Sequence, residues 1–95
     1  MADFIFLTHT GPGDDRDWGA YISKHNVAGV FRGGSAMGEG ICVKKAGAAP
    51  AITAHLGGYI KIEANDLADA QRYLPGHPGY ESGGVVEIRE LPRRD

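Results

Sequence analysis

The chain has 95 residues, which is the size of one domain and too short for a Rossmann dehydrogenase or a barrel enzyme. Its 10 basic and 12 acidic residues give a formal net charge of −2, so it lacks the basic excess of a typical nucleic-acid-binding protein. Hydrophobic residues make up 42% of the chain and charged residues 23%, which excludes wholesale disorder. We therefore predict a single domain over residues 1–95 that binds no nucleic acid.

Cysteine content and the amino-terminal residues bear on the cellular compartment. Cys42 is the only cysteine, so no disulfide can form within the chain. Asp3 stands where a signal peptide carries basic residues, and the apolar run Phe4–Leu7 is too short for a signal core or a membrane span. We predict a cytoplasmic protein without a membrane partner.

The first third of the chain predicts a strand followed by a helix. The run Phe4–Thr8 is apolar at both alternating positions, as in a strand that is covered on both faces. Asp14 is placed to cap a helix, and Gly29 is placed to end it in a left-handed conformation. One apolar helix face is formed by Trp18, Tyr21, Ile22, His25 and Ala28.

The glycine-rich middle of the chain predicts weaker strands. Val30–Met37 is a predicted strand in which the adjacent Gly33 and Gly34 indicate a bulge, or the close approach of another backbone. Ile41–Lys45 predicts one additional short strand, and residues 46–54 predict a loop.

The second half predicts a strand and a second helix. Gly57–Glu63 alternates between apolar and polar residues, with Ile60 and Ile62 facing one side. Asn65 or Asp66 caps the following helix. Its buried stripe comprises Leu67, Ala70, Tyr73 and Leu74.

A turn-rich loop over residues 77–80 and a last strand over Val85–Leu91 complete the pattern. This order predicts an α+β fold of the ferredoxin-like βαββαβ type, with Ile41–Lys45 as an extra short strand. Two helices would cover one face of an antiparallel sheet. Because a second copy of the sheet is the simplest cover for the other face, we predict a homodimer.

Three stretches, in this order, resemble the YCII-related domain family, and specifically its DGPF-type branch. They are the run Trp18–Met37, the run Leu56–Ala64 with Asp66-Leu67 and Ala70, and the end with His77-Pro78, Gly83-Gly84 and Val86–Arg89. The resemblance covers about residues 3–92. It implies a ferredoxin-like fold of the dimeric α/β-barrel kind, in which two sheets pack face to face and a cleft lies near the interface.

The chain departs from the DGPF-type pattern before the Leu56–Ala64 stretch. Members of the branch carry an Asp-Gly-Pro-Phe segment there, whereas residues 46–55 of this chain lack both the acid and the aromatic residue. Any role of that motif therefore does not carry over. Some relatives in the broader family have a His-Asp pair suspected of catalysis, and His25 is the nearest candidate for that histidine.

Histidines are the candidate catalytic residues. Histidine changes charge near neutral pH, so His25, on the apolar helix face, could act as a general base or acid. The alternative is a half-buried histidine that packs at the edge of the core. His9, which follows the first strand, has the same two interpretations. None of the four histidines is spaced for a local metal pair, so we predict no metal site.

The candidate ligand-binding residues lie on the first helix, the glycine-rich strand and the loops. Arg32 offers a planar fork for a carboxylate or phosphate, and glycine backbone beside it lets a ligand approach. The alternative is that Arg32 pairs with Glu63 or Glu87. The predicted set comprises Arg32, Gly33, Ser35, Tyr21, His55 and His77.

These residues support three hypotheses about function. The first is a YCII-like homodimer that binds a small polar or anionic ligand in a cleft between the first helix and the sheet, with or without simple acid–base catalysis. The second is a non-catalytic regulatory or interaction module of the same fold. The third is metal or haem binding. The first hypothesis requires no cofactor.

Overall fold

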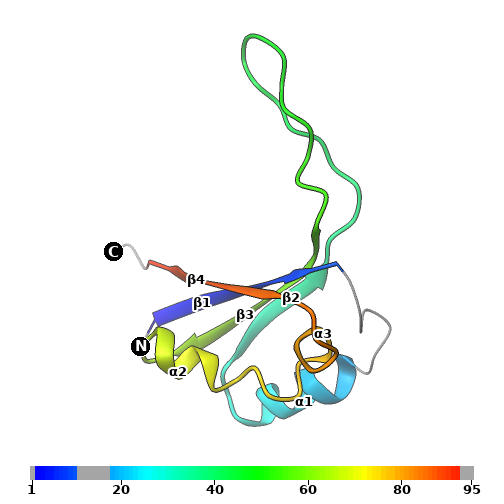
Figure 1. The fold of residues 1–95 in the computed structure, drawn as a ribbon. Helices are drawn as coiled ribbons and strands as arrows, with labels where there is room; N and C mark the ends of the chain where they lie inside the picture. Colours follow the sequence, from blue (N-terminus) through cyan, green and yellow to red (C-terminus); the bar gives the residue numbers. More distant parts are fainter. Residues whose placement is uncertain (1, 11–17, 93–95) are drawn as a thin grey trace.

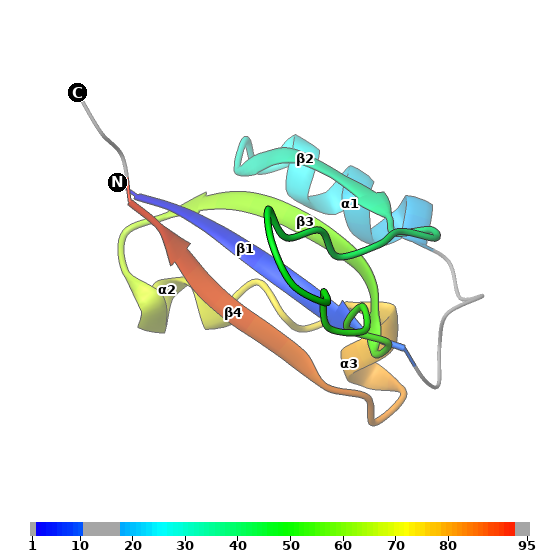
Figure 2. The ribbon, with the colours of Figure 1, turned by 90° about the horizontal axis from the view of Figure 1, so that it is seen from above.

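The computed structural model describes residues 2–10 and 18–92. Four strands form one open sheet in the order β2-β3-β1-β4, and every neighbouring pair is antiparallel. The three described helices lie on one face of this sheet, so the fold is α+β (Figures 1 and 2). The elements are β1 (Ala2–His9), α1 (Trp18–Val27), β2 (Phe31–Ala36), β3 (Leu56–Ala64), α2 (Leu67–Gln71), α3 (Pro78–Glu81) and β4 (Val86–Leu91).

The core lies between the helices and the sheet. Phe4 and Phe6 of β1 are buried, and they stand opposite Ile62 and Ile60 of β3. Residues directly opposite each other on antiparallel strands share a face, so these four side chains form one apolar layer. The alternation predicted for β3 is confirmed.

Glycine shapes the chain where the sequence predicts it. Gly29 has φ +78° after the end of α1, which confirms the left-handed stop. The pairing of β2 with β3 shifts register between Phe31 and Gly34, which confirms a bulge. A Cβ atom on Gly34 would lie 2.6 Å from the carbonyl oxygen of Tyr59, so a side chain there would push the two strands apart.

Residues 37–55 form a long arm between β2 and β3 that rises away from the sheet on the side opposite the helices (Figure 1). The strand predicted for Ile41–Lys45 is wrong, because this stretch pairs with no neighbouring strand. Its apolar side chains also lack a cover, since Ile41 is 82% exposed and Val43 is 79% exposed. The loop predicted for residues 46–54 is confirmed.

The second half contains one more helix than the sequence predicts. Asp66 caps α2, where its side chain accepts a hydrogen bond from the Asp69 N–H, as predicted. The predicted loop over residues 77–80 is wrong, because α3 begins at Pro78. The His77 side chain caps this helix, and Pro78 supplies the fixed φ that suits a first helical position.

The sheet face opposite the helices carries apolar and charged side chains together. Ile5 and Leu7 of β1 are half-buried on this face. Beside them, the Arg32 guanidinium lies 2.9 Å from the Glu63 carboxylate. Within the described ranges, 2–10 and 18–92, no helix has the length and apolar character that crossing a membrane requires.

Replacing Ile62 by alanine tests the position of the core. Ile62 is fully buried, so Ile62→Ala should lower the free energy of unfolding by about 2–5 kcal/mol through the lost contacts and the cavity left behind. Leu67, an isomer of isoleucine that the sequence predicts to be buried, is instead 51% exposed, so Leu67→Ala should cost less than about 1 kcal/mol. Urea unfolding of both variants measures this, and equal losses would contradict the assignment.

Candidate functional site

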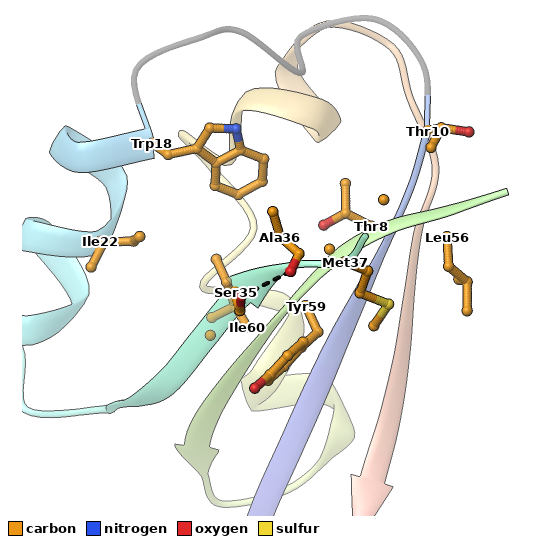
Figure 3. A pocket seen from close by; sticks show the side chains of 13 residues that line it. Thr8, Thr10, Trp18, Ile22, Ser35, Ala36, Met37, Leu56, Tyr59 and Ile60 are labelled. Atoms are coloured by element: carbon orange, nitrogen blue, oxygen red, sulfur yellow. Dashed lines mark hydrogen bonds between the residues drawn. The ribbon is translucent and has the colours of Figure 1, made fainter. Parts of the chain in front are cut away.

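A pocket of about 550 Å³ lies between the first turns of α1 and one end of the sheet (Figure 3). Its walls come from the end of β1, from Trp18 and Ile22 of α1, from residues 34–37, and from residues 56–60. Pockets that bind small molecules typically measure roughly 300–1,000 Å³. The pocket is therefore large enough for a metabolite-sized ligand.

The pocket exists because small residues meet on the helix-facing side of the sheet. Gly58 stands opposite Thr8 of β1 on one side and opposite Ala36 of β2 on the other. A row with one missing side chain and one methyl group leaves space that larger residues would fill. Figure 3 shows the Trp18 ring across this space from Thr8 and Ala36. The pocket therefore lies at the Thr8–Gly58 pair, whereas the next inward-facing pair, Phe6 and Ile60, fills the core with large side chains.

Most side chains that line the pocket are apolar, and the described ones carry no charge. The lining residues with polar side chains are Thr8, Thr10, Ser35 and Tyr59. Ser35 Oγ donates to the carbonyl oxygen of Ala36 at 2.8 Å, so its proton is engaged. The lining therefore suits an apolar molecule with a few polar atoms.

Thr8 connects the pocket to the buried side chain of His77. Thr8 is only 4% exposed, and its Oγ1 lies 3.2 Å from Nε2 of His77. His77 is not exposed at all, and its Nδ1 lies 3.2 Å from the backbone nitrogen of Tyr80. The ring also makes edge contacts with Trp18 and Tyr21, at centroid distances of 4.7 and 5.2 Å. His77, predicted as a ligand contact, thus stands behind the pocket wall.

The surroundings of His77 keep its ring neutral. Burial lowers the pKa of His77 from 6.5 to about 4, with a smaller contribution from the nearby His25 in the same direction. A hydrogen bond with the backbone of His77 itself opposes this shift only in part. At neutral pH the ring therefore has one N–H and one lone pair.

His25 and Tyr21 lie in the core rather than at the pocket. The two ring nitrogens of His25 lie 2.9 and 3.0 Å from the carbonyl oxygens of Tyr21 and Tyr73. The Tyr21 hydroxyl donates to the same Tyr73 oxygen at 2.6 Å, and burial raises the pKa of Tyr21. Neither side chain lines the pocket. Their contacts match the structural alternative, a histidine that packs in the core and bonds to backbone.

Of the residues predicted to bind an anionic ligand on β2, one lines the pocket and two lie outside it. Ser35 lines the pocket, but Arg32 and Gly33 do not. Arg32 pairs with Glu63, one of the two acids that the structural alternative names, and it also donates to the carbonyl oxygen of Gly29 at 2.9 Å.

The structure brings two predicted histidines together near the base of the arm. The rings of His9 and His55 meet edge to face with centroids 4.6 Å apart, and His9 Nε2 lies 3.7 Å from a carboxylate oxygen of Glu87. The Arg89 side chain, which donates a hydrogen bond to this carboxylate, lowers the pKa of Glu87. Among residues 2–10 and 18–92, no group of histidine, cysteine, aspartate or glutamate side chains could hold a metal ion.

Sequence reasoning missed Thr8 as a site residue. The available signal is its parity, because Thr8 falls on the same strand face as Phe4 and Phe6 and is the polar member of that series. A polar side chain that faces a core needs a partner, but the partner of Thr8 lies 69 positions away in sequence.

Comparison of the chain with family models, curated proteins and solved structures found no match.

Acidification should destabilise the protein through His77. The unfolded chain binds a proton near the ordinary pKa of 6.5, whereas the folded chain does so only near 4. The free energy of unfolding therefore falls as the pH drops through this window, by roughly 2–3 kcal/mol from this residue. Urea unfolding at pH 7 and pH 4.5 measures the loss.

His77→Asn is the matched control for that measurement. Asparagine also accepts a hydrogen bond at a helix N-cap but does not titrate. The variant should be less stable at pH 7 and should lose less stability on acidification. The same pH dependence in both proteins would show that His77 is not responsible.

Proposed function

We propose that this protein binds a small, largely apolar molecule in the pocket beside α1. The observation that carries the proposal is the pocket itself, about 550 Å³ in volume, lined mainly by apolar side chains and bordered by the hydroxyl of a nearly buried threonine. A pocket of this size with few polar groups is the usual form of a small-molecule site. The position of the pocket agrees with the cleft that the sequence predicts between the first helix and the sheet.

The described lining residues change the expected character of the ligand. Arg32, the predicted partner of an anionic group, lies outside the pocket and is paired with Glu63. The Trp18 ring offers a broad apolar surface for a planar or aliphatic body. The proposal is therefore a neutral molecule with an apolar body and a few polar atoms.

Trp18 provides a direct assay because it is the only tryptophan in the chain. The neutral fluorescent probe N-phenyl-1-naphthylamine should bind with energy transfer from Trp18. Ala36→Phe, which fills the pocket from an exposed lining position, should reduce this binding at least tenfold. Ala28→Phe adds the same ring outside the pocket and serves as the control. Equal binding by both variants would contradict the proposal.

We also propose that the fold is of the ferredoxin-like kind and that the chain is a YCII-related domain. The support is the element order, in which α1 connects β1 to β2 and the helices α2 and α3 connect β3 to β4. The strand order β2-β3-β1-β4 supports the same fold. The motif stretches that carry the resemblance fall on α1, β2 and β3, on the starts of α2 and α3, and on β4.

A homodimer is the proposed assembly. The half-buried Ile5 and Leu7 on the open sheet face, and the exposed Ile41 and Val43 on the arm, form apolar surface that one chain leaves uncovered. A second copy can cover both regions by a two-fold symmetric contact, because each copy then offers the same surface.

Light scattering at micromolar concentration should give twice the mass of one chain. Val43 is 79% exposed, so Val43→Asp should leave the fold intact while it weakens the dimer. Thr53→Asp adds the same charge at an exposed position of the arm and is the control. A monomeric mass for the unmodified protein would contradict the proposed assembly.

A further inference from the structure

We infer that Thr8 donates its hydroxyl proton into the pocket, so that the bound molecule carries a hydrogen-bond acceptor such as a carbonyl oxygen at that point, and that His77 fixes this direction. The inference rests on the proposed function, because it names the class of ligand that the pocket beside α1 would select. Four successive steps lead from the backbone of α3 to the pocket.

The first step concerns Nδ1 of His77. Its partner at 3.2 Å is the backbone N–H of Tyr80, which can only donate. Nδ1 must therefore present its lone pair, as the N-cap of α3 requires. A proton on Nδ1 would place two donors against each other and leave the N–H of Tyr80 without its acceptor.

The second step concerns Nε2. In a neutral ring with a lone pair on Nδ1, the proton is on Nε2. Nε2 then donates to Oγ1 of Thr8 at 3.2 Å. The opposite direction, from the threonine hydroxyl to the ring, would require the tautomer that the Tyr80 N–H excludes.

The third step concerns the hydroxyl of Thr8. A hydroxyl has one proton and can accept two hydrogen bonds. The bond from His77 takes one acceptor position and leaves the proton for another partner. Among the described residues, His77 is the one hydrogen-bond partner of Oγ1 of Thr8. Figure 3 shows this oxygen turned toward the space between Trp18 and Ala36.

The fourth step concerns what can meet that proton. Ser35 Oγ bonds to the Ala36 carbonyl and makes no bond with Thr8, and the surfaces of Trp18 and Ile22 are apolar. A ligand oxygen placed against Thr8 would complete the hydroxyl, whereas an apolar ligand atom would leave a nearly buried donor without a partner. An unpaired buried donor is costly, so the pocket discriminates between these two ligands.

A pair of compounds of the same shape tests this preference. 2-Acetylnaphthalene and 2-ethylnaphthalene differ by a carbonyl group in place of a methylene group. Binding of each is measured by quenching of Trp18 fluorescence. We expect the protein to bind the ketone about fivefold more tightly relative to the hydrocarbon, after each affinity is corrected for transfer from water to octanol, as one neutral hydrogen bond predicts. Thr8→Ser should keep this ratio, and Thr8→Val should bring it to about one.

His77 is a positioning residue, so its test is the same ratio rather than affinity alone. His77→Asn keeps an acceptor for the Tyr80 N–H but has a shorter side chain that presents no ring N–H to Thr8. The proton of the freed hydroxyl is then no longer held toward the pocket, so the preference for the ketone should fall below twofold. His77→Gln, which can reach Thr8 with an amide N–H, should retain more of it.

The outcomes distinguish a failure of this inference about Thr8 from a failure of the proposed function, ligand binding in the pocket beside α1. If both compounds bind and Ala36→Phe blocks both, but the corrected ratio in the unmodified protein is one, then the pocket stands and the role of Thr8 is overturned. If the ratio is unchanged in Thr8→Val, the inference is also overturned. If neither compound binds, the proposed function fails and the inference fails with it. The circular dichroism of each variant confirms that it folds, and Thr8→Ala, which also removes the hydroxyl, serves where Thr8→Val does not fold.

Discussion

The buried imidazole of His77 joins parts of the chain that are far apart in sequence. Through Nδ1 it caps α3, and through Nε2 it holds Thr8 near the end of β1. Its ring also packs against Trp18 and Tyr21 of α1. The helix α3, the strand β1 and the helix α1 therefore meet at one neutral side chain. Because a charged ring could neither accept from the Tyr80 N–H nor be buried cheaply, this meeting point depends on neutrality.

The pocket follows from the same arrangement together with the small residues of the sheet. Gly58 and Ala36 leave the space, and Trp18 covers it from α1. His77 supports both Trp18 and Thr8 from behind, so the apolar wall and the hydroxyl are held by one group. The site thus has a buried hydroxyl beside a mainly apolar surface, and a site with a buried hydrogen-bonding group discriminates against ligands that lack the matching group.

Local patterns were enough to predict most elements of the fold. The apolar face of α1 holds from Trp18 to His25, whereas Ala28, predicted as its last member, lies beyond the helix and is exposed. This face, the left-handed Gly29, the bulge at Gly33 and Gly34 and the Asp66 cap each depend on residues within a few positions of one another. The sequence does not predict the short helix α3 because its N-cap is a histidine, which is not among the residues preferred at helix N-caps. The strand predicted for Ile41–Lys45 is wrong because an apolar run forms a strand only where another strand pairs with it.

The candidate site was predictable only in outline. The cleft beside the first helix and Ser35 at its edge could be anticipated from the helix pattern and the glycine-rich strand. The roles of Thr8 and His77 could not, because their contact joins positions that only the sheet topology brings together. His25 shares a helix face with Trp18, but it lies about two turns further along α1, where it is in the core beside Tyr73.

The tautomer of His77 is the measurement that tests this account most directly. Long-range proton–nitrogen correlation spectra of the uniformly 15N-labelled protein distinguish a ring protonated at Nε2 from one protonated at Nδ1. The account predicts a neutral ring with its proton on Nε2 that stays neutral from pH 7 down to about pH 5, consistent with a pKa of about 4. A proton on Nδ1, or titration of His77 near pH 6.5, would contradict it.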